Sequence, residues 1–295
     1  MTTSYLAIPH MHVKRANALA TPYLVNATPV FAAAMFAHGL SVSVTPRLKH
    51  VGTAYVHHDA QILMDRLPNF RNNGYFEASH LSLMKGACMT TTGSGNKGEY
   101  DSKAFARRQP VIATQPHALA HLEISLIVAF EGTRPPVSAV ADEVARRRLA
   151  GGHIVDFGKV RYCNTLSEAY SAIDSGHILL DKSDLLAGKH DKVNSLIESC
   201  RRGSTETWCM PTVLGYATLT PFSNRKGVRN IPGTDKVPLH AYAEPLVAPV
   251  QFRAFRRSTI NSISLSETLW HYAWLGTDVF AITQRQNKQE ATNGN

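Results

Sequence analysis

The sequence predicts an α+β fold of the ferredoxin-like type. Apolar residues alternate in several short segments, as in half-buried strands, and two other segments carry helix start and stop signals. Along residues 4 to 157 these segments follow the order strand, helix, strand, long insertion, strand, helix, strand. That is the split β-α-β order of the ferredoxin-like fold, which RNA-recognition domains share.

The first strand is expected at residues 4 to 13, where Pro9 indicates a sheet edge or a bulge. Thr28 and Pro29 are residue types preferred at the N-cap and the first position of a helix. The apolar run that follows them predicts a buried helix that ends at Gly39.

Residues 52 to 63 and 120 to 130 are expected to form the second and third strands, because apolar and polar residues alternate in both. Ser138 is expected to cap a helix that continues to Ala150 and stops at the two glycines after it. Residues 153 to 157 are then expected to return as the fourth strand.

These elements predict the domain organisation. Residues 1 to 160 are expected to form the ferredoxin-like domain, with an insertion at about residues 65 to 117. The insertion is polar and rich in glycine, so it should project as a basic, flexible thumb. Residues 161 to 283 are expected to form an α/β extension packed on this domain, and residues 284 to 295 a disordered tail.

The extension is expected to contain two strands and one broken helix. The strands are predicted at residues 177 to 180 and 211 to 221, and the broken helix at residues 182 to 200. Ser264 and Glu267 have the spacing of a capping box. That pattern predicts a further helix, in which Trp270 and Trp274 lie one turn apart.

The composition excludes several classes of protein. The chain has 295 residues, of which 44% are hydrophobic and 18% charged, so it can form a folded core. It has no apolar run of about 18 residues and no signal-peptide pattern at its start, so a cytoplasmic protein without a membrane partner is expected. Its four cysteines lack C-x-x-C spacing, which indicates reduced thiols and no zinc site.

Positive charge is distributed unevenly along the chain. The net charge is +9, and residues 1 to 58 contain no acidic residue. Residues 201 to 257 contain nine cations and three acidic residues, whereas residues 168 to 198 contain six acidic residues and three lysines. This segregation favours one basic face that binds a nucleic-acid backbone, with solvated surface charge as the alternative. The candidate contact residues in the two basic regions are Lys14, Arg15, Arg225, Lys226 and Arg229.

The segment from Arg146 to Gly152 combines three arginines with two glycines. Glycines allow a backbone to approach a ligand closely, and main-chain N–H groups beside arginines can bind phosphates. Arg147, Arg148, Gly151 and Gly152 are therefore candidate RNA contacts. The alternative is a plain helix stop on a solvated helix.

The sequence contains no strong enzyme signature. Walker, dinucleotide-binding, H-E-x-x-H and G-x-S-x-G motifs are absent from it. The pairs His10/His12 and His57/His58 suggest a ribonuclease or a metal site, but no carboxylate or thiolate has a recognisable spacing to them. A noncatalytic protein without a cofactor or a metal is therefore expected.

Short segments over most of the chain resemble, in the same order, those of one known family. They are IPHMHVKRANALATP, AHLEISLIVAFEG, RRLAGG, MPTVLGYATLTP, GVRN, PLHAYAEPLV and SETLWHYAW. The family is the Cas-five-type subunit of type I-F CRISPR surveillance complexes, the second protein of the Csy set. The chain keeps the Ala16-Asn17-Ala18 part of the family's strand-end signature, whereas YLVNATP replaces the Trp-Gly part.

The resemblance implies a modified RNA-recognition domain of the RAMP type that acts without catalysis. In a Cascade ribonucleoprotein such a subunit holds the 5′ handle of the CRISPR RNA and caps the backbone filament. It lies beside the first backbone subunit and the large subunit where one is present, and the complex recognises target DNA in antiviral defence. The resemblance further implies that Lys14, Arg15 and Asn17 hold phosphate and a splayed handle base, and that Gly151 and Gly152 belong to the glycine-rich loop of the fold.

Two alternatives stay open. The first is a metal-independent endoribonuclease of the same superfamily that processes repeat RNA with His10 or His12. The second is a repeated filament subunit that coats the spacer instead of capping the handle.

Overall fold

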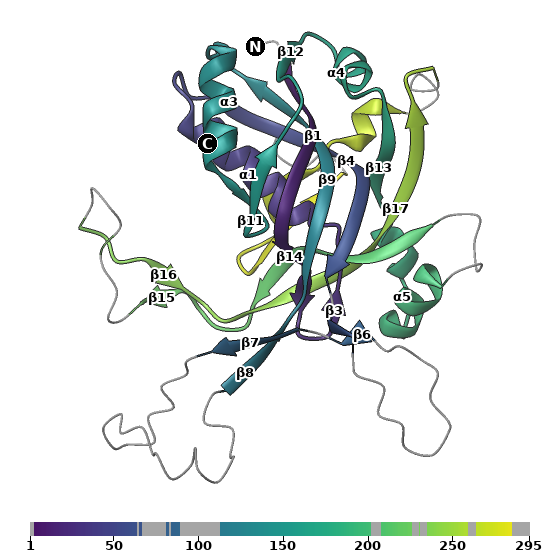
Figure 1. Cartoon of the computed structure of the whole chain (residues 1–295). Helices are drawn as coiled ribbons and strands as arrows, with labels where there is room; N and C mark the ends of the chain where they lie inside the picture. Colours follow the sequence, from purple (N-terminus) through teal and green to yellow (C-terminus); the bar gives the residue numbers. More distant parts are fainter. Residues whose placement is uncertain are drawn as a thin grey trace.

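The computed structural model describes residues 3–63, 65–66, 81–82, 84–88, 113–201, 208–225, 230, 235–258 and 264–284. These residues form a mixed α+β structure, dominated by an 11-stranded antiparallel sheet that curls into a half-barrel (Figure 1). Four α-helices accompany the sheet in these parts of the chain. None of the described helices is long and apolar enough to cross a membrane.

The first half of the chain builds four neighbouring strands in the order β11-β1-β9-β4. Apart from short hairpins and the two-residue strand before β11, the chain passes through β1, α1, β4, β9, α3 and β11, and all three strand pairs are antiparallel. The bounds are Ser4–Asn17 for β1, Val30–Ser43 for α1, Lys49–Leu63 for β4, Leu119–Glu131 for β9, Val137–Arg146 for α3 and Gly152–Asp156 for β11. All four predicted strands are confirmed. The bulge expected at Pro9 is also present, because the register of β1 against β9 shifts between Ile8 and Met11.

The second half of the chain continues the same sheet beyond β4. The strand order is β4-β13-β17-β14-β19-β18, and residues 177–178 of β13 pair with residues 56–57 of β4. The new strands are β13 (Ser175–Asp181), β14 (Cys209–Thr218), β17 (Ala243–Arg256), β18 (His271–Trp274) and β19 (Val279–Thr283). The broken helix consists of a 3-10 turn at Ser183–Leu186 and α5 at Lys192–Cys200. The two strands and the broken helix predicted for the extension are thus confirmed.

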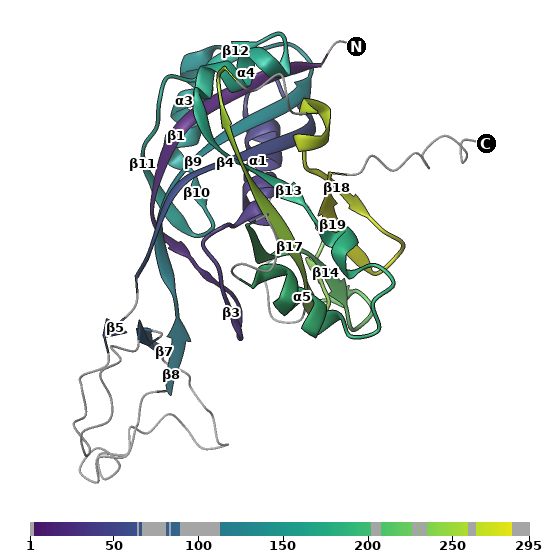
Figure 2. The ribbon, with the colours of Figure 1, turned by 90° about the vertical axis from the view of Figure 1, so that its right-hand side faces the viewer.

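Shorter elements complete the fold. Near β1 they are β2 (Leu19–Thr21), β3 (Leu24–Val25), β10 (Arg148–Leu149), β12 (Arg161–Cys163) and α4 (Leu166–Ile173). The separate hairpins are β5 (Asp65–Arg66) with β6 (Leu81–Ser82), β7 (Met84–Cys88) with β8 (Ala113–His117), and β15 (Ser223–Asn224) with β16 (Leu239–His240). Figures 1 and 2 show β7 and β8 projecting from the ends of β4 and β9. Most of the predicted thumb, and the predicted tail after Gln284, lie outside the described residues.

Two hydrophobic cores cover the two faces of the sheet. In β9, residues Leu122, Ile124, Leu126, Val128 and Phe130 belong to the larger core together with α1 and α3. Ile127 and Ala129 belong to the smaller core together with α4. The second half of β9 is therefore buried on both faces, which explains its nearly continuous apolar sequence. The larger core also includes Leu214, Phe252 and Trp270, so the extension shares it with the first half of the chain.

Helix α1 differs from its prediction at both ends. Its N-cap is Pro29, and no side chain caps it. The Thr28 hydroxyl, predicted to be the cap, donates instead to Oδ1 of Asn26. The helix also continues past Gly39 to Ser43. A Cβ atom at Gly39 would lie 2.9 Å from Nη1 of Arg147, so this glycine admits a neighbouring side chain and does not end the helix.

Helix α3 is shorter than predicted. Its N-cap is Pro136 instead of Ser138, and it ends at Arg146. The chain then forms β10 and pairs with β11, where Leu149 lies opposite Gly152. Leu149 is fully buried, and this burial stabilises the strand over a longer helix. The two loop residues, Ala150 and Gly151, both have positive φ, 48° and 77°, as a two-residue type I′ hairpin requires.

The prediction of a helix after Ser264 is wrong. Leu265–Thr268 forms one 3-10 turn without a side-chain cap, and residues 271–274 form a strand. The backbone of Trp270 exchanges two hydrogen bonds with Thr53 of β4, at 2.8 and 2.9 Å. This pairing with a distant strand holds the segment in an extended conformation instead of a helix. Trp270 is fully buried, whereas Trp274, the last residue of β18, is half exposed.

Burial of three histidines predicts that acid destabilises the fold. Burial is the largest cause that lowers the pKa of His50, His57 and His58 to about 4, and neighbouring histidines lower it further. In the unfolded chain these groups titrate near 6.5, so the unfolded state binds more protons between about pH 6.5 and 4. We expect the free energy of unfolding, measured with urea, to fall steadily as the pH decreases through this range.

A substitution separates this effect from general acid sensitivity. His57→Phe removes one titrating group, so the slope of unfolding free energy against pH near pH 5 should decrease by about 1.4 kcal/mol per pH unit. His190→Phe changes an exposed histidine and should leave the slope as it is. Equal slopes in the two variants would contradict the assignment of the acid sensitivity to the buried ring.

Candidate nucleic-acid interface

The end of β1 presents two cations to solvent. Lys14 and Arg15 are exposed, whereas Val13 and Ala16 on either side of them are buried. A second irregularity against β9, between Val13 and Ala16, produces this pattern, and Arg15 there has a φ of 59°. The backbone N–H of Arg15 donates to Nδ1 of His121 at 3.2 Å. Among the described residues, no carboxylate forms an ion pair with either cation.

The β10–β11 turn packs directly against this strand end. Lys14 pairs with His153 of β11, and the backbone N–H of Asn17 donates to the carbonyl oxygen of Ala150 at 2.8 Å. Two groups of residues that were predicted from separate features of the sequence thus form one surface. More than 130 residues of chain separate them, so sequence spacing alone did not predict that they meet.

The two glycines of the turn have different roles. A Cβ atom at Gly152 would lie 2.7 Å from the backbone nitrogen of Ala16 and 2.8 Å from the carbonyl oxygen of Lys14. The close approach expected at Gly152 is therefore made to β1 and not to a ligand. Gly151 is exposed, and a Cβ atom placed there would meet no neighbouring atom within 4 Å, so this glycine leaves the surface of the turn open.

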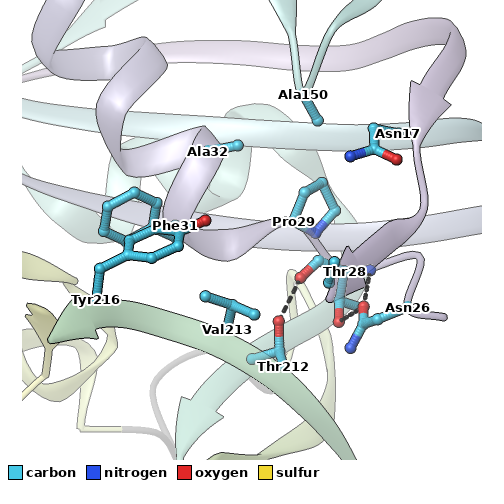
Figure 3. A pocket seen from close by; sticks show the side chains of 11 residues that line it. Asn17, Asn26, Thr28, Pro29, Phe31, Ala32, Ala150, Thr212, Val213 and Tyr216 are labelled. Carbon is cyan, nitrogen blue, oxygen red and sulfur yellow. Dashed lines mark hydrogen bonds between the residues drawn. The ribbon is translucent and has the colours of Figure 1, made fainter. Parts of the chain in front are cut away.

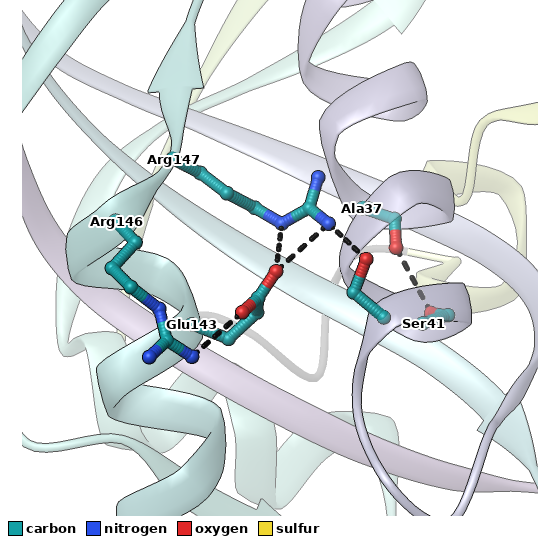
Figure 4. A network of polar contacts seen from close by, with 6 residues as sticks. Ala37, Ser41, Glu143, Arg146 and Arg147 are labelled. Atoms are coloured by element: carbon teal, nitrogen blue, oxygen red, sulfur yellow. Dashed lines mark hydrogen bonds and ion pairs between the residues drawn. The ribbon is translucent and has the colours of Figure 1, made fainter. Parts of the chain in front are cut away.

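Arg147 and Arg148 also differ, because only the second is free of side-chain partners in the described structure. Nε of Arg147 donates to Oε1 of Glu143 at 2.9 Å, and a second guanidinium nitrogen donates to the hydroxyl of Ser43 (Figure 4). Arg147 thereby links α3 to the end of α1. Arg146 binds the same carboxylate, and the hydrogen bond from Arg146, followed by that from Arg147, lowers the pKa of Glu143. Arg148 is exposed on β10, beside the turn.

Asn17 bonds to its own chain. Its Oδ1 accepts from the backbone N–H of Leu19 at 3.1 Å, and its Nδ2 donates to the carbonyl oxygen of Leu19 at 3.3 Å. This is the geometry of a turn residue that stabilises the backbone two residues further on. The side chain is exposed at the same time, so it also lies on the surface of the strand end.

The predicted contacts of the second basic region lie elsewhere. Arg225 follows β15 and is exposed, and its backbone N–H donates to the carbonyl oxygen of Pro238 at 3.0 Å. It belongs to the β15–β16 hairpin, which Figure 1 shows as an arm projecting from the sheet. Lys226 and Arg229 lie outside the described residues.

A cluster of polar side chains next to this site was not predicted. Nδ1 of His10 lies 2.8 Å from Oε1 of Glu123, and Nε2 of His58 lies 2.6 Å from Oγ of Ser125. The two imidazole rings stack with their centroids 4.3 Å apart. Glu123, Ser125 and Ile127 are every second residue of β9 and therefore lie on the same face of the sheet. Helix α4 covers this face further along β9. His10 is the residue at the bulge of β1, with a φ of 46°.

The electrostatics of this cluster keep one carboxylate charged and one histidine neutral. Burial opposes ionisation of Glu123, but the hydrogen bond from His10 and the nearby His12 and His58 outweigh it and lower its pKa. Burial, followed by repulsion from His10, lowers the pKa of His58 to about 4. The signal in the sequence was the pair of histidines at each of two strands, but their partners on β9 are recognisable only from the register.

The fold and the site define an α+β protein with exposed cations at a strand end beside a glycine turn. The chain matches no protein-family model and no curated protein. Among the described residues, no group of three or more potential ligands has a geometry that would hold a metal ion.

The packing of Gly152 predicts a strong effect of a single methyl group. Gly152→Ala should lower the free energy of unfolding by about 1–3 kcal/mol, because the added Cβ overlaps backbone atoms of β1 that cannot rotate away. Urea denaturation monitored by circular dichroism measures this loss. Gly151→Asn is the matched control, since asparagine tolerates positive φ and the space around this position is open. A Gly152→Ala protein as stable as the control would contradict the packing role.

Proposed function

We propose that this protein is a noncatalytic guide-RNA-binding subunit of a type I-F CRISPR surveillance complex. In this role it holds the 5′ handle of the CRISPR RNA and caps the backbone filament. The observation that carries the proposal is the meeting of the exposed Lys14 and Arg15 with the β10–β11 turn on one surface. These are also the segments on which the sequence resembles the family.

The arrangement of the strands supports a ferredoxin-like, RRM-like domain of the RAMP type. The order β11-β1-β9-β4, with α1 and α3 in the crossovers, is the order that a split β-α-β domain requires. In this proposal residues 161 to 283 are the C-terminal extension, and its strands from β13 onward lengthen the same sheet. The β7–β8 hairpin forms the base of the thumb, because it projects from β4 and β9.

The chemistry of the surface fits an RNA backbone. Lys14, Arg15 and Arg148 are exposed cations, and Lys14 and Arg148 both lie opposite His153 in the sheet. Cations without a carboxylate partner can neutralise phosphates, with release of bound counterions. Asn17 and Gly151 border the same surface, where a nucleotide can approach the turn.

The proposed partners follow from this role. The CRISPR RNA is the direct ligand, and target DNA is bound by the assembled complex. The backbone subunit, and a large subunit where one is present, contact the protein within the complex. No cofactor is required for this function.

Charge reversal at the strand end tests the RNA site. Lys14→Glu with Arg15→Glu should weaken binding of guide RNA and of unrelated single strands alike. The slope of log affinity against log salt should decrease by about one to two units, at ~0.7 per phosphate. Fluorescence anisotropy at four salt concentrations measures both quantities.

The control carries the same change of charge on another part of the surface. Lys189→Glu with Lys192→Glu alters two exposed lysines at the start of α5 and just before it, within the acidic stretch of the chain. This variant should keep the wild-type salt slope. The same slope in both double variants would remove the end of β1 from the RNA site.

One observation favours a second candidate, a metal-independent endoribonuclease. The pairing of His10 with Glu123 orients an imidazole whose side chain is 44% exposed, as a general base requires. The stacked His58 supplies a second imidazole within the same cluster. In this second proposal these two rings act on the phosphodiester.

Incubation of the purified protein with labelled repeat RNA decides between the two functions. The noncatalytic proposal expects intact RNA after prolonged incubation, with or without magnesium. Cleavage that disappears in His10→Ala and persists in His190→Ala, which changes an exposed histidine, would establish the endoribonuclease instead.

A further inference from the structure

A cavity of about 140 Å³ lies next to the proposed RNA site (Figure 3). Asn17 at the end of β1 and Ala150 of the β10–β11 turn form one side of it. The first turn of α1 contributes Phe31 and Ala32, and β14 contributes Tyr216. The cavity therefore lies where the first half of the chain meets the extension, and it borders the exposed side chain of Asn17.

The walls of the cavity are largely apolar and are held in place. The ring of Phe31 meets that of Tyr216 edge to face, with centroids 5.3 Å apart. The polar groups at the base bond to one another: the hydroxyl of Thr28 donates to Oδ1 of Asn26, and that of Thr212 donates to the carbonyl oxygen of Thr28 at 2.8 Å. Because these groups satisfy each other, the cavity is formed before any ligand enters.

The size of the cavity limits what it can hold. An engineered protein cavity of ~150 Å³ with apolar walls binds benzene. A cavity of about 140 Å³ therefore accommodates one six-membered ring and leaves too little room for a fused purine. Aromatic walls favour a flat ring, because bases stack and pack against aromatic side chains.

The start of α1 adds a preference for hydrogen-bond acceptors. Pro29 is the N-cap of this 14-residue helix, and no side chain caps the first turn. The N–H of Val30 donates to the carbonyl oxygen of Thr28. The N–H groups of Phe31 and Ala32, in contrast, have no partner within the helix, so an acceptor from outside can bind there. Phe31 and Ala32 of this turn line the cavity. Pyrimidine bases carry carbonyl oxygens beside a single ring, which matches both the acceptor preference and the size.

We propose that this cavity binds one pyrimidine base, turned out from the single-stranded RNA whose phosphates contact Lys14 and Arg15. The inference rests on the proposed function, since it uses the same strand end. It adds a position that discriminates pyrimidines from purines by shape. Phosphate contacts alone give no such discrimination, because every nucleotide carries the same phosphate.

Binding of oligo(U) and oligo(A) of equal length to the full chain tests the proposal. Wild-type protein should prefer oligo(U) by on the order of tenfold, as expected for one buried base. Ala32→Leu fills the cavity from a helical position and should reduce this preference to nearly equal binding. The salt dependence of binding should stay unchanged, because both cations are intact. Ala145→Leu, the same change at an exposed position of α3, should behave as wild type.

The outcomes separate the cavity from the RNA site. Equal binding of both oligonucleotides by wild type, or a preference for oligo(U) that survives Ala32→Leu, would overturn the cavity proposal and leave the proposed function standing. Absence of salt-dependent binding to any single strand would overturn both. Photo-crosslinking of oligo(4-thiouridine) to wild type gives a test that needs no variant: crosslinks at Phe31 or Tyr216 support the cavity, and crosslinks confined to other residues refute it.

Discussion

The pairing of β1 with β9 is the interaction on which the rest of the structure depends. It runs from Ser4 opposite Phe130 to Asn17 opposite Leu119. Since residues opposite each other in an antiparallel pair point to the same face, this register decides which side chains enter each core. It also brings the cluster of His10 and Glu123 together and aligns the end of β1 with the turn after β10.

The candidate functional residues lie where this pairing is interrupted. β1 has two irregularities against β9, and a residue with positive φ lies at each of them, His10 at the first and Arg15 at the second. Each extra residue changes the direction of the side chains around it, so polar groups reach the surface from a strand that is otherwise mostly buried. The backbone strain at these residues is maintained by the regular pairing on both sides.

Sequence patterns predicted the strands well, because alternation and apolar runs report burial directly. They failed where a distant contact decided the local structure. The segment around Trp270 has a helical start signal, yet its pairing with Thr53 makes it extended. Leu149 ends α3 because it is buried as part of β10, and no local signal marks that change.

Only part of the candidate site could be predicted from the sequence, because the rest depends on contacts between distant segments. Lys14 and Arg15 were recognisable from the absence of nearby acidic residues, which is a property of the sequence itself. The packing of Gly152 against β1, the ion pair of Arg147 and the cavity beside Asn17 depend on elements far apart in the chain. Only the register and the crossing of these elements reveal them.

The position of Trp270 has a consequence for how the chain folds during synthesis. This fully buried side chain belongs to the larger core, and its backbone pairs with a strand made more than 200 residues earlier. The side chain of Gln284 donates to the carbonyl oxygens of Leu179 and Thr268, and these hydrogen bonds connect the segment to β13. While the ribosome still holds this segment, the core around α1 and β4 lacks the side chain of Trp270. The N-terminal half therefore reaches its native packing only after residue 270 has left the ribosome, and until then part of the larger core stays open.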